Sequence, residues 1–352
     1  MPLVAHSQLP TFDQLRVQGQ DVLSLKDALH QDIRELNIGL LNMMPDAALQ
    51  ATERQFMRLI GSCNQIAQFY IHPFSIPGLA RGKDTQDYIN NFYTSFESVK
   101  KQGLDALIIT GANVASPMLE QQPFWHTLKE VISWATENVA SVLCSCLSTH
   151  ALVKHLYNID RYMLPQKLWG VYSHRITQVE HPVLRDINTR FDVPQSRYNT
   201  LLREQLEKAG LKILVESLDG GVNMAVSPDN FRIFFLQGHP EYDSNSLLKE
   251  YKREILLFLD GKRPDYPPSP ENYFSPEAQS IAEQYKLMVF IAKEKGTPIP
   301  PFPEQRIEPY LDNTWRDTGK AIFNNWLGLV YQKTAFDHPH PLVRPDSSGK
   351  TV

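Results

Sequence analysis

Several features are scarce or missing in this sequence, and each absence excludes a class of protein. Only three cysteines occur among 352 residues, which is too small and odd a number for the disulfide framework of a secreted domain. No apolar run approaches the roughly 20 residues that a transmembrane helix needs. The first ten residues lack the basic start and apolar centre of a secretory signal. We therefore expect a protein of the reducing cytoplasm that makes no contact with a membrane.

Clusters of basic charge are missing as well. The net charge is −4 at pH 7, and lysine and arginine do not gather in one stretch, so we expect no nucleic-acid partner. The contents of 42% hydrophobic and 21% charged residues are ordinary for a globular protein. Prolines, by contrast, gather after Gly261, which indicates a change of architecture there.

Apolar runs bounded by turns alternate with amphipathic segments through residue 159, which is typical of a parallel sheet between helices. We therefore predict an α/β fold, a three-layer sandwich with a mostly parallel sheet. Residues 1–32 are expected to form an N-terminal arm, 33–262 the core, and 263–352 a Pro-rich, helical C-terminal extension that packs on the core. The main expected strands are 36–42, 66–72, 104–110, 140–143, 211–216, 222–227 and 231–237, and the main helices are 47–60, 125–138, 247–259, 276–295 and 315–332.

The stretch 142–152 contains the first candidate for chemistry. An apolar strand runs into a turn that contains Cys144 and Cys146, and a helix-forming segment follows at once. A sharp strand-to-helix turn can present a nucleophile at the sheet edge, where the helix amino terminus favours a thiolate. The alternative is a buried strand end with two structural cysteines, because free cysteine is among the most buried residue types.

His239 and Glu241 follow a later expected strand. An acid two residues after a histidine points to the same side in extended backbone, so it can orient the imidazole through its second nitrogen. Cysteine, histidine and glutamate in this order would make a triad of nucleophile, base and orienting carboxylate. The alternative is that His-Pro-Glu is only a polar end of the strand.

Taken together, these motifs resemble class I glutamine amidotransferases, in which a cysteine at a sharp turn is followed by His-x-Glu on a later strand. Their turn usually reads Gly-x-Cys-x-Gly, whereas this chain has Cys144–Ser148. The chain more closely resembles the homoserine O-succinyltransferase family, which uses the same fold for acyl transfer. That resemblance extends from about residue 33 to residue 332, and its markers are Ile38–Pro45, Leu107–Ala112, Gly238–Asp243, Asn272–Phe274, Thr314–Arg316 and Asn325–Leu327.

The resemblance assigns catalytic roles to four positions. It makes Cys146 the acylated nucleophile, His239 the base and Glu241 its partner, and it lets the backbone N–H of Leu147 donate to an oxyanion. The family has tryptophan directly after the nucleophile and glutamine four places after it, where this chain has Leu147 and His150.

The resemblance also places the acceptor amino acid. Arg253 would hold its α-carboxylate, Glu250 would accept from its α-amine, and Lys167 and Ser196 match polar positions of the family pocket. Because Glu250 and Arg253 stand three residues apart on an expected helix, an ordinary surface ion pair is the alternative for these two.

The acyl group is expected to depend on Ala115, since the family has glutamate there for acetyl transfer and a small residue for succinyl transfer. The implied function is succinyl transfer from succinyl-CoA to the hydroxyl of homoserine through a cysteine thioester. Acyl-CoA and homoserine are then the small-molecule partners, with no cofactor and no metal, and the family's usual state is a homodimer. Homoserine O-acetyltransferase, serine O-acyltransferase, a glutamine amidotransferase-type hydrolase and a non-catalytic binding protein remain as alternatives.

Overall fold

The computed structural model describes residues 3–63, 67–114, 116 and 118–336 of the chain. An 11-stranded sheet runs through them in the order β2-β1-β4-β3-β5-β6-β11-β10-β9-β7-β8. In this order, each strand from β2 through β11 pairs in parallel with its neighbour. From β11 through β8 the neighbouring strands are antiparallel. The strands are β1 (Leu3–Ala5), β2 (Val22–Ser24), β3 (Glu35–Leu41), β4 (Gln68–Phe74), β5 (Ala106–Ile109), β6 (Ser141–Ser145), β7 (Tyr162–Ile176), β8 (Arg190–Thr200), β9 (Lys212–Ser217), β10 (Gly221–Val226) and β11 (Ile233–Leu236).

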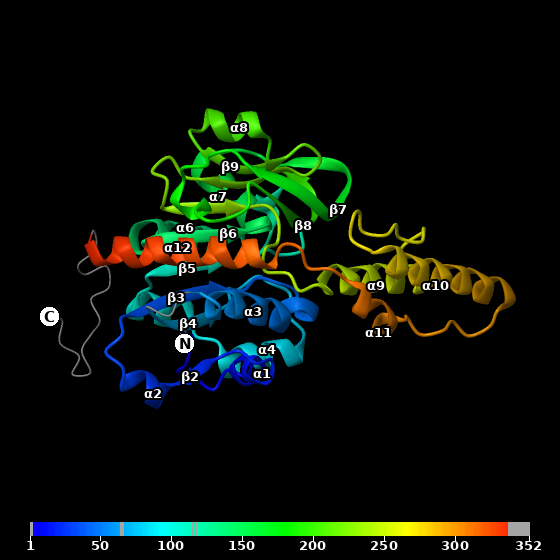
Figure 1. The fold of residues 1–352 in the computed structure, drawn as a ribbon, viewed down its shortest axis with the longest axis horizontal. Helices are drawn as coiled ribbons and strands as arrows, with labels where there is room; N and C mark the ends of the chain where they lie inside the picture. The colour runs from blue at the N-terminus through cyan, green and yellow to red at the C-terminus, as the bar shows by residue number, and fades with distance from the viewer. Residues whose placement is uncertain (1–2, 64–66, 115, 117, 337–352) are drawn as a thin grey trace.

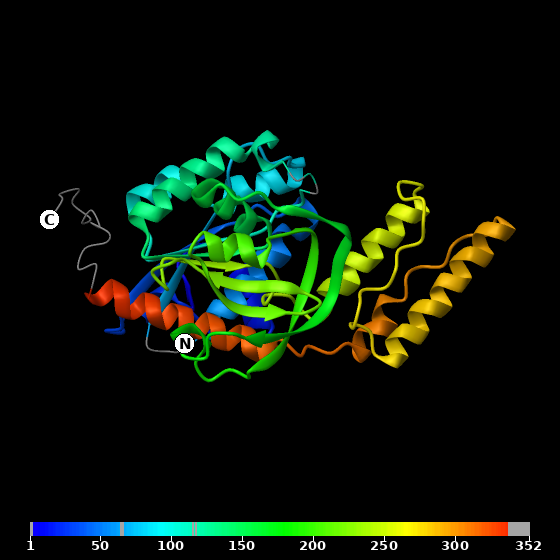
Figure 2. The ribbon, with the colours of Figure 1, turned by 90° about the horizontal axis from the view of Figure 1, so that it is seen from above.

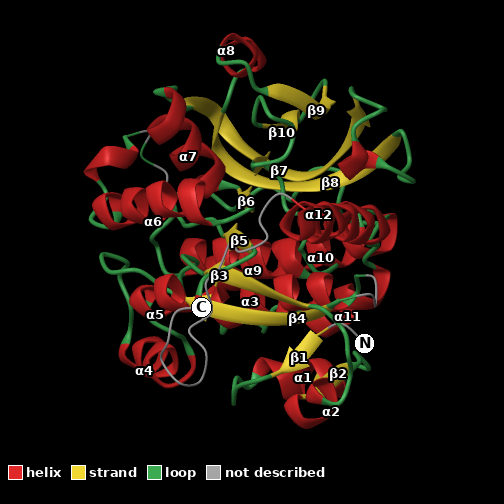
Figure 3. Ribbon diagram, turned by 90° about the vertical axis from the view of Figure 1, so that its left-hand side faces the viewer, coloured by secondary structure: helices red, strands yellow, loops and turns green. Residues whose placement is uncertain are grey.

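Helices cover both faces of this sheet (Figure 3). One face packs on α1, α3 and α12, and the other packs on α5, α6 and α7, each through its own cluster of buried apolar side chains. The predicted three-layer α/β sandwich with a mostly parallel sheet is therefore confirmed. The helices are α1 (Thr11–Val17), α2 (Leu25–Leu29), α3 (Asp46–Gly61), α4 (Lys83–Phe92), α5 (Phe96–Gln102), α6 (Trp125–Asn138), α7 (Leu147–Tyr157), α8 (Arg203–Lys208), α9 (Ser246–Leu259), α10 (Pro276–Lys295), α11 (Glu304–Ile307) and α12 (Arg316–Phe336).

The first and last elements of the described residues both belong to the sandwich. Residues 1–32, for which the sequence predicts an arm, contribute β1 and β2, which extend the sheet beyond β4. At the other end α12 returns along the sandwich (Figure 1). Its Trp326 is fully buried and donates its indole N–H to the Ser141 hydroxyl of β6 at 2.9 Å. Helix α12 is therefore part of the core packing.

Helices α9, α10 and α11 project sideways from the sandwich (Figure 2). We call residues 246–310 the helical arm. Its buried side chains, among them Tyr251 and Tyr285, form a separate apolar cluster that reaches the sheet through Trp169 and Val171 of β7. The base of the arm, α9, therefore lies next to the antiparallel part of the sheet. No helix among the described residues is long and apolar enough to cross a membrane.

Candidate active site

Cys146 occupies a strained turn between β6 and α7. Its φ of 56° and ψ of −115° lie outside the regions that a residue with a side chain prefers, and such strain persists mainly where function needs it. The Cys146 N–H donates to the Leu236 carbonyl of β11 at 2.8 Å, and the Ser148 hydroxyl donates to the Ile109 carbonyl of β5 at 2.7 Å. Both neighbouring strands therefore fix the turn, which has the geometry of a nucleophile elbow.

The structure separates the two cysteines of this stretch. Cys144 is completely buried, and burial raises the pKa of its thiol well above the ordinary value. Cys146 is only partly buried. Since a nucleophile must be reached by its substrate, this difference favours Cys146, as the sequence interpretation does.

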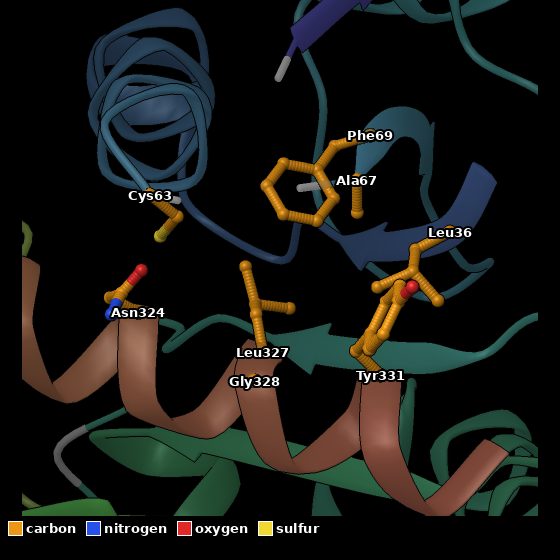
Figure 4. Close-up of a pocket in the computed structure, with 8 residues that line it drawn as sticks. All are labelled: Leu36, Cys63, Ala67, Phe69, Asn324, Leu327, Gly328 and Tyr331. Carbon is orange, nitrogen blue, oxygen red and sulfur yellow. The ribbon is translucent and has the colours of Figure 1, made fainter. Parts of the chain in front are cut away.

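The third cysteine lies elsewhere. Cys63 borders a small, mainly apolar cavity between α3, β4 and α12 (Figure 4), and burial raises the pKa of its thiol to about 12. A buried thiol of this kind is inert, so the reactive candidate remains Cys146.

His239 stands just past the end of β11, the strand that pairs in parallel with the strand of Cys146. Its backbone N–H donates to the Pro194 carbonyl at 2.9 Å, and its Nδ1 lies 2.7 Å from Oε1 of Glu241. Both side chains are buried. Because Nδ1 is engaged by the carboxylate, Nε2 is the nitrogen available to a nucleophile.

The charges around His239 favour its protonated form. Burial acts to lower its pKa, but the negative charges of Glu241 and Cys146 outweigh burial, and the pKa is raised to about 10. A hydrogen bond between the Cys146 and His239 side chains acts in the same direction. The structure thus brings Cys146, His239 and Glu241 together in the order that a triad requires.

Sequence reasoning missed a buried polar network beneath this edge. Asn223 of β10 accepts from the Gly238 backbone N–H at 3.0 Å. Gln237 accepts from His150 at 2.9 Å and from the Leu201 N–H at 3.0 Å. These bonds satisfy the backbone N–H of Gly238 and hold the side chain of the neighbouring Gln237, so they fix the segment that leads to His239. The one sign of this network in the sequence was His150, which stands where the family has glutamine.

Two of the predicted substrate residues, Lys167 and Ser196, donate to the carboxylate of a third, Glu250. Glu250 of α9 accepts from Lys167 at 3.0 Å, from Ser196 at 2.6 Å and from Tyr242 at 2.8 Å. Burial acts to raise the pKa of Glu250, but the Lys167 charge and the three hydrogen bonds dominate and lower it. We call Lys167, Ser196, Tyr242 and Glu250 the acceptor cluster.

Tyr242 joins the acceptor cluster to the triad. Its ring stacks on the His239 imidazole with the centroids 4.2 Å apart and 17° between the planes. The sequence interpretation used Tyr242 only as a family marker. The structure gives it a contact with both parts of the site.

Arg253 lies apart from this cluster. Its side chain is 46% exposed, and its ion pair is with Glu254 at 3.6 Å. The Glu250 carboxylate is engaged by Lys167, so the surface pairing of Glu250 with Arg253, which was the alternative interpretation, does not form.

Two further predictions concern Leu147 and Ala115. Leu147 is the first residue of α7, where backbone N–H groups have no partner within the helix. A Cβ added at Gly111 would lie 3.6 Å from the Leu147 nitrogen and 3.2 Å from the Cys146 Cβ, so the backbone of Gly111 borders the same spot. The oxyanion role of Leu147 stays a prediction. Ala115 lies outside the described residues.

Fold and site together define a class: an α/β protein with a cysteine elbow and a His-x-Glu pair at the ends of neighbouring parallel strands. The family model for homoserine O-succinyltransferase matches residues 2–336. The chain is 59% identical to the homoserine O-succinyltransferase of Nitrosococcus oceani, over 97% of this chain and 96% of that one. It is 57% identical to that of Methylococcus capsulatus, over 97% of each. The chain belongs to the homoserine O-succinyltransferase family.

The solved structures to which the chain is similar are much more distant in sequence. A glutamine amidotransferase from Methylobacillus flagellatus is 12% identical and superposes with a TM-score of 0.47, over 84% of this chain and 95% of that one. A glutamine amidotransferase from Thermotoga maritima is 13% identical with a TM-score of 0.40, over 86% and 99%.

Proposed function

We propose that this chain transfers a succinyl group from succinyl-CoA to the hydroxyl of homoserine through a thioester on Cys146. The observation that carries the proposal is the placement of the partly buried Cys146 at a strained elbow beside the His239–Glu241 pair. Membership of the homoserine O-succinyltransferase family supports the choice of substrates.

In the first half-reaction the Cys146 thiolate attacks the thioester carbonyl of succinyl-CoA. The backbone N–H of Leu147 donates to the oxyanion that forms. Protonated His239 gives its proton to the departing CoA thiolate, which leaves neutral His239 and a succinyl thioester on Cys146. In the second half-reaction His239 takes the proton of the homoserine hydroxyl as that oxygen attacks the thioester, and Cys146 leaves as a thiolate. Acid–base assistance of this kind contributes roughly 10²- to 10⁴-fold.

The acceptor cluster is the proposed site of homoserine. The Glu250 carboxylate has two oxygens and can accept from an ammonium group while it keeps its bonds to Lys167 and Ser196. Arg253, one turn along α9, is proposed to close on the α-carboxylate, which its exposed guanidinium permits. Tyr242 contacts both parts of the site: its hydroxyl donates to Glu250, and its ring stacks on His239. It therefore fixes the position of the bound amino acid relative to the base.

The proposal is tested by incubating the protein with succinyl-CoA and measuring the mass of the intact chain. Wild type should gain one succinyl group, and Cys146→Ala should gain none. Cys144→Ala is the matched control, since the buried Cys144 is two residues away, and it should still be acylated. An adduct that maps to Cys144, or turnover that survives in Cys146→Ala, would refute the assignment.

A substrate matrix separates the proposed activity from its alternatives. Succinyl-CoA and acetyl-CoA are each combined with homoserine and serine, and free thiol release is measured. Succinyl-CoA with homoserine should give the highest kcat/KM, in keeping with the small residue at position 115. Ammonia release from glutamine without thiol release would instead support a hydrolase.

We further propose that the chain acts as a homodimer in the cytoplasm. The projecting helix α10 exposes Leu287, Phe290 and Ile291, which share one face at helical spacing, together with Met288. Such a gathering of exposed apolar side chains is typical of a protein–protein interface. All three cysteines are free, which fits a reducing compartment.

Light scattering after size-exclusion chromatography tests the dimer. Wild type should have twice the mass of the chain, and Leu287→Glu combined with Ile291→Glu should give the monomer mass. Leu218→Glu is the control, because Leu218 is fully exposed outside the helical arm, and it should stay dimeric. A wild-type monomer would disprove the dimer and leave the proposed reaction untouched.

A further inference from the structure

Gln195 lies beneath the catalytic edge of the sheet, and the proposed reaction gives it no role. It stands on β8, directly after Pro194, whose carbonyl accepts from the His239 backbone N–H at 2.9 Å. The side chain of Gln195 is completely buried and ends in an amide, so both the oxygen and the nitrogen of that amide need partners. The partners are Arg197 for the oxygen and Asn223 for the nitrogen.

Arg197 determines which way this amide points. A guanidinium can only donate, so the Gln195 oxygen faces Arg197 and the amide nitrogen faces the opposite side. Arg197 is itself held in place, because its Nη2 also donates to the Gly220 carbonyl at 2.7 Å. The Gln195 nitrogen then donates to Oδ1 of Asn223 at 3.2 Å.

His174 favours the same orientation of the amide. Its Nδ1 lies 2.8 Å from the Tyr172 carbonyl, which can only accept, so Nδ1 carries the proton. Burial lowers the pKa of His174 to about 4, so the ring is neutral at pH 7 and its Nε2 is an acceptor. That Nε2 lies 3.4 Å from the Gln195 amide nitrogen. Turning the amide over would therefore set its oxygen against two acceptors.

Asn223 connects this amide to the backbone that leads to the base. Its Oδ1 also accepts from the Gly238 N–H at 3.0 Å. A Cβ added at Gly238 would lie 2.6 Å from that Oδ1 and 2.7 Å from the Gln195 amide nitrogen, so this backbone packs directly on both amides. His239 is the next residue. A change in the Gln195 amide therefore shifts Gly238 or breaks its hydrogen bond, and either result moves His239.

We propose that Gln195 is a positioning residue that holds His239 in line with Cys146 through Asn223 and Gly238. The inference rests on the proposed function, in which His239 gives and takes a proton in the two half-reactions. Gln195 itself is assigned no contact with a substrate. Alignment of this kind matters because a misplacement of about 1 Å can cost about 100-fold in rate. The alternative is that Gln195 only fills the interior and supports stability.

Gln195→Glu tests the proposal and preserves the shape of the side chain. An oxygen then replaces the nitrogen that faces Asn223, and the Arg197 guanidinium favours the ionised carboxylate. Because two acceptors now meet, Asn223 can no longer hold the Gly238 N–H as it does in wild type. Single-turnover acylation by succinyl-CoA and transfer to homoserine should both slow about 10- to 100-fold. The KM for homoserine should stay unchanged.

A double-mutant cycle shows whether the effect passes through Asn223. Asn223→Leu removes the acceptor of the Gly238 N–H and should slow both steps as well. When Gln195→Glu is combined with Asn223→Leu, the rates should be no lower than in Asn223→Leu alone, because the opposing acceptor is gone. Losses that multiply would overturn the proposal, since the new charge would then act on the site directly.

Alkylation with iodoacetamide tests the positioning without any substrate. Cys63 and Cys144 are buried, so the first adduct seen in the mass of the intact chain reports on Cys146. The hydrogen bond to His239 stabilises the Cys146 thiolate. Gln195→Glu should therefore slow alkylation at pH 7 at least about tenfold, the loss expected for a hydrogen bond to a charged group. An unchanged rate would overturn the proposal. Wild type that transfers no succinyl group would refute the proposed function and leave this readout intact.

Gln68→Glu is the matched control. Gln68 is also buried, and its amide nitrogen donates to the Ala28 carbonyl at 3.0 Å, so the substitution sets an acceptor against an acceptor in the same way. It lies on β4, which β3 and β5 separate from the strand that leads to Cys146. Gln68→Glu should lower the free energy of unfolding and leave both reaction steps and the alkylation rate unchanged. Equal losses of rate in this control would overturn the assignment.

A second variant covers the case in which Gln195→Glu does not fold. Gln195→Met removes the donor to Asn223 without adding a charge. It should slow both steps and the alkylation by a smaller factor, because Asn223 can still accept from Gly238. Rates equal to those of wild type in Gln195→Met would overturn the proposal.

Discussion

The two parts of the candidate site are built in different ways. The triad stands on parallel strands: Cys146 follows β6, His239 follows β11, and Ser145 pairs with Leu236 in the register between them. The acceptor cluster is assembled from the antiparallel part of the sheet and the helical arm, with Lys167 on β7, Ser196 on β8 and Glu250 on α9.

The triad and the acceptor cluster are held in place by different kinds of hydrogen bond. The triad is fixed by backbone bonds, such as those from Cys146 to Leu236 and from His239 to Pro194. The acceptor cluster is joined through side chains that meet on the Glu250 carboxylate. Damage to the cluster should therefore affect only the step that uses the amino acid, whereas damage to the triad should affect both half-reactions.

Lys167→Met gives the largest expected effect that separates the two parts. Without the ammonium, the buried Glu250 loses its charge partner and its pKa rises, so the proposed amine site is weakened. The KM for homoserine should rise at least about 30-fold, which corresponds to the roughly 2 kcal/mol or more that is lost when one partner of a buried charge pair is removed. The rate of Cys146 acylation by succinyl-CoA should stay unchanged.

Lys252→Met is the control for that experiment. Lys252 also lies on α9 but pairs with Glu304 of α11, so its loss removes a lysine without touching Glu250. Both half-reactions should proceed as in wild type. If Lys167→Met slows acylation as much as it weakens homoserine binding, the two parts of the site are not separable.

Glu241→Gln addresses the triad through its pH dependence. The Glu241 charge helps to raise the His239 pKa to about 10, so the amide should lower that pKa. In the proposed mechanism, acylation needs protonated His239 to give a proton to the departing CoA thiolate. The alkaline limb of the single-turnover acylation rate should therefore move from near pH 10 to lower pH. Glu216→Gln, which removes a carboxylate paired with Arg203, should leave the limb in place, and an unshifted limb in Glu241→Gln would exclude the orienting role.

Sequence reasoning could predict that Cys146 and His239 lie near each other, because parallel strand ends meet at one sheet edge. Short motifs after two buried strands are then enough to bring Cys146 and His239 together. The main strands and helices of the core were predicted because their apolar residues form clear runs or recur at helical spacing, even where a strand is as short as the four residues of β5 and of β11. β1 and β2, at three residues each, are too short to show a period, and their pairing depends on β4.

The acceptor cluster was harder to foresee. Lys167 and Glu250 are 83 residues apart, and their contact depends on how the helical arm meets β7. Residues 162–168 of β7 were not predicted as strand, because Pro165 interrupts the pattern and the pairing with β8 is irregular between Met163 and Leu168. The family resemblance named Lys167 and Ser196, but only the structure shows that they meet on Glu250 together with Tyr242.

The smallest predicted effect concerns His150, where the family has glutamine. Burial lowers the pKa of His150 to about 3, so the folded chain holds it neutral while an unfolded chain protonates it near pH 6.5. The unfolded state then binds more protons between these values, and His150 costs stability progressively as the pH falls from about 6.5 towards 3, with a slope of up to about 1.4 kcal/mol per pH unit.

His150→Gln removes this titration and can keep a bond to Gln237. Urea unfolding at pH 7 and pH 5 should show a smaller loss of stability in the variant than in wild type. His126→Gln is the control, because the His126 side chain on α6 is 81% exposed and lies outside the buried network. An equal loss in wild type and His150→Gln would mean that His150 is not held neutral, and the network beneath His239 would then have to accommodate a charge.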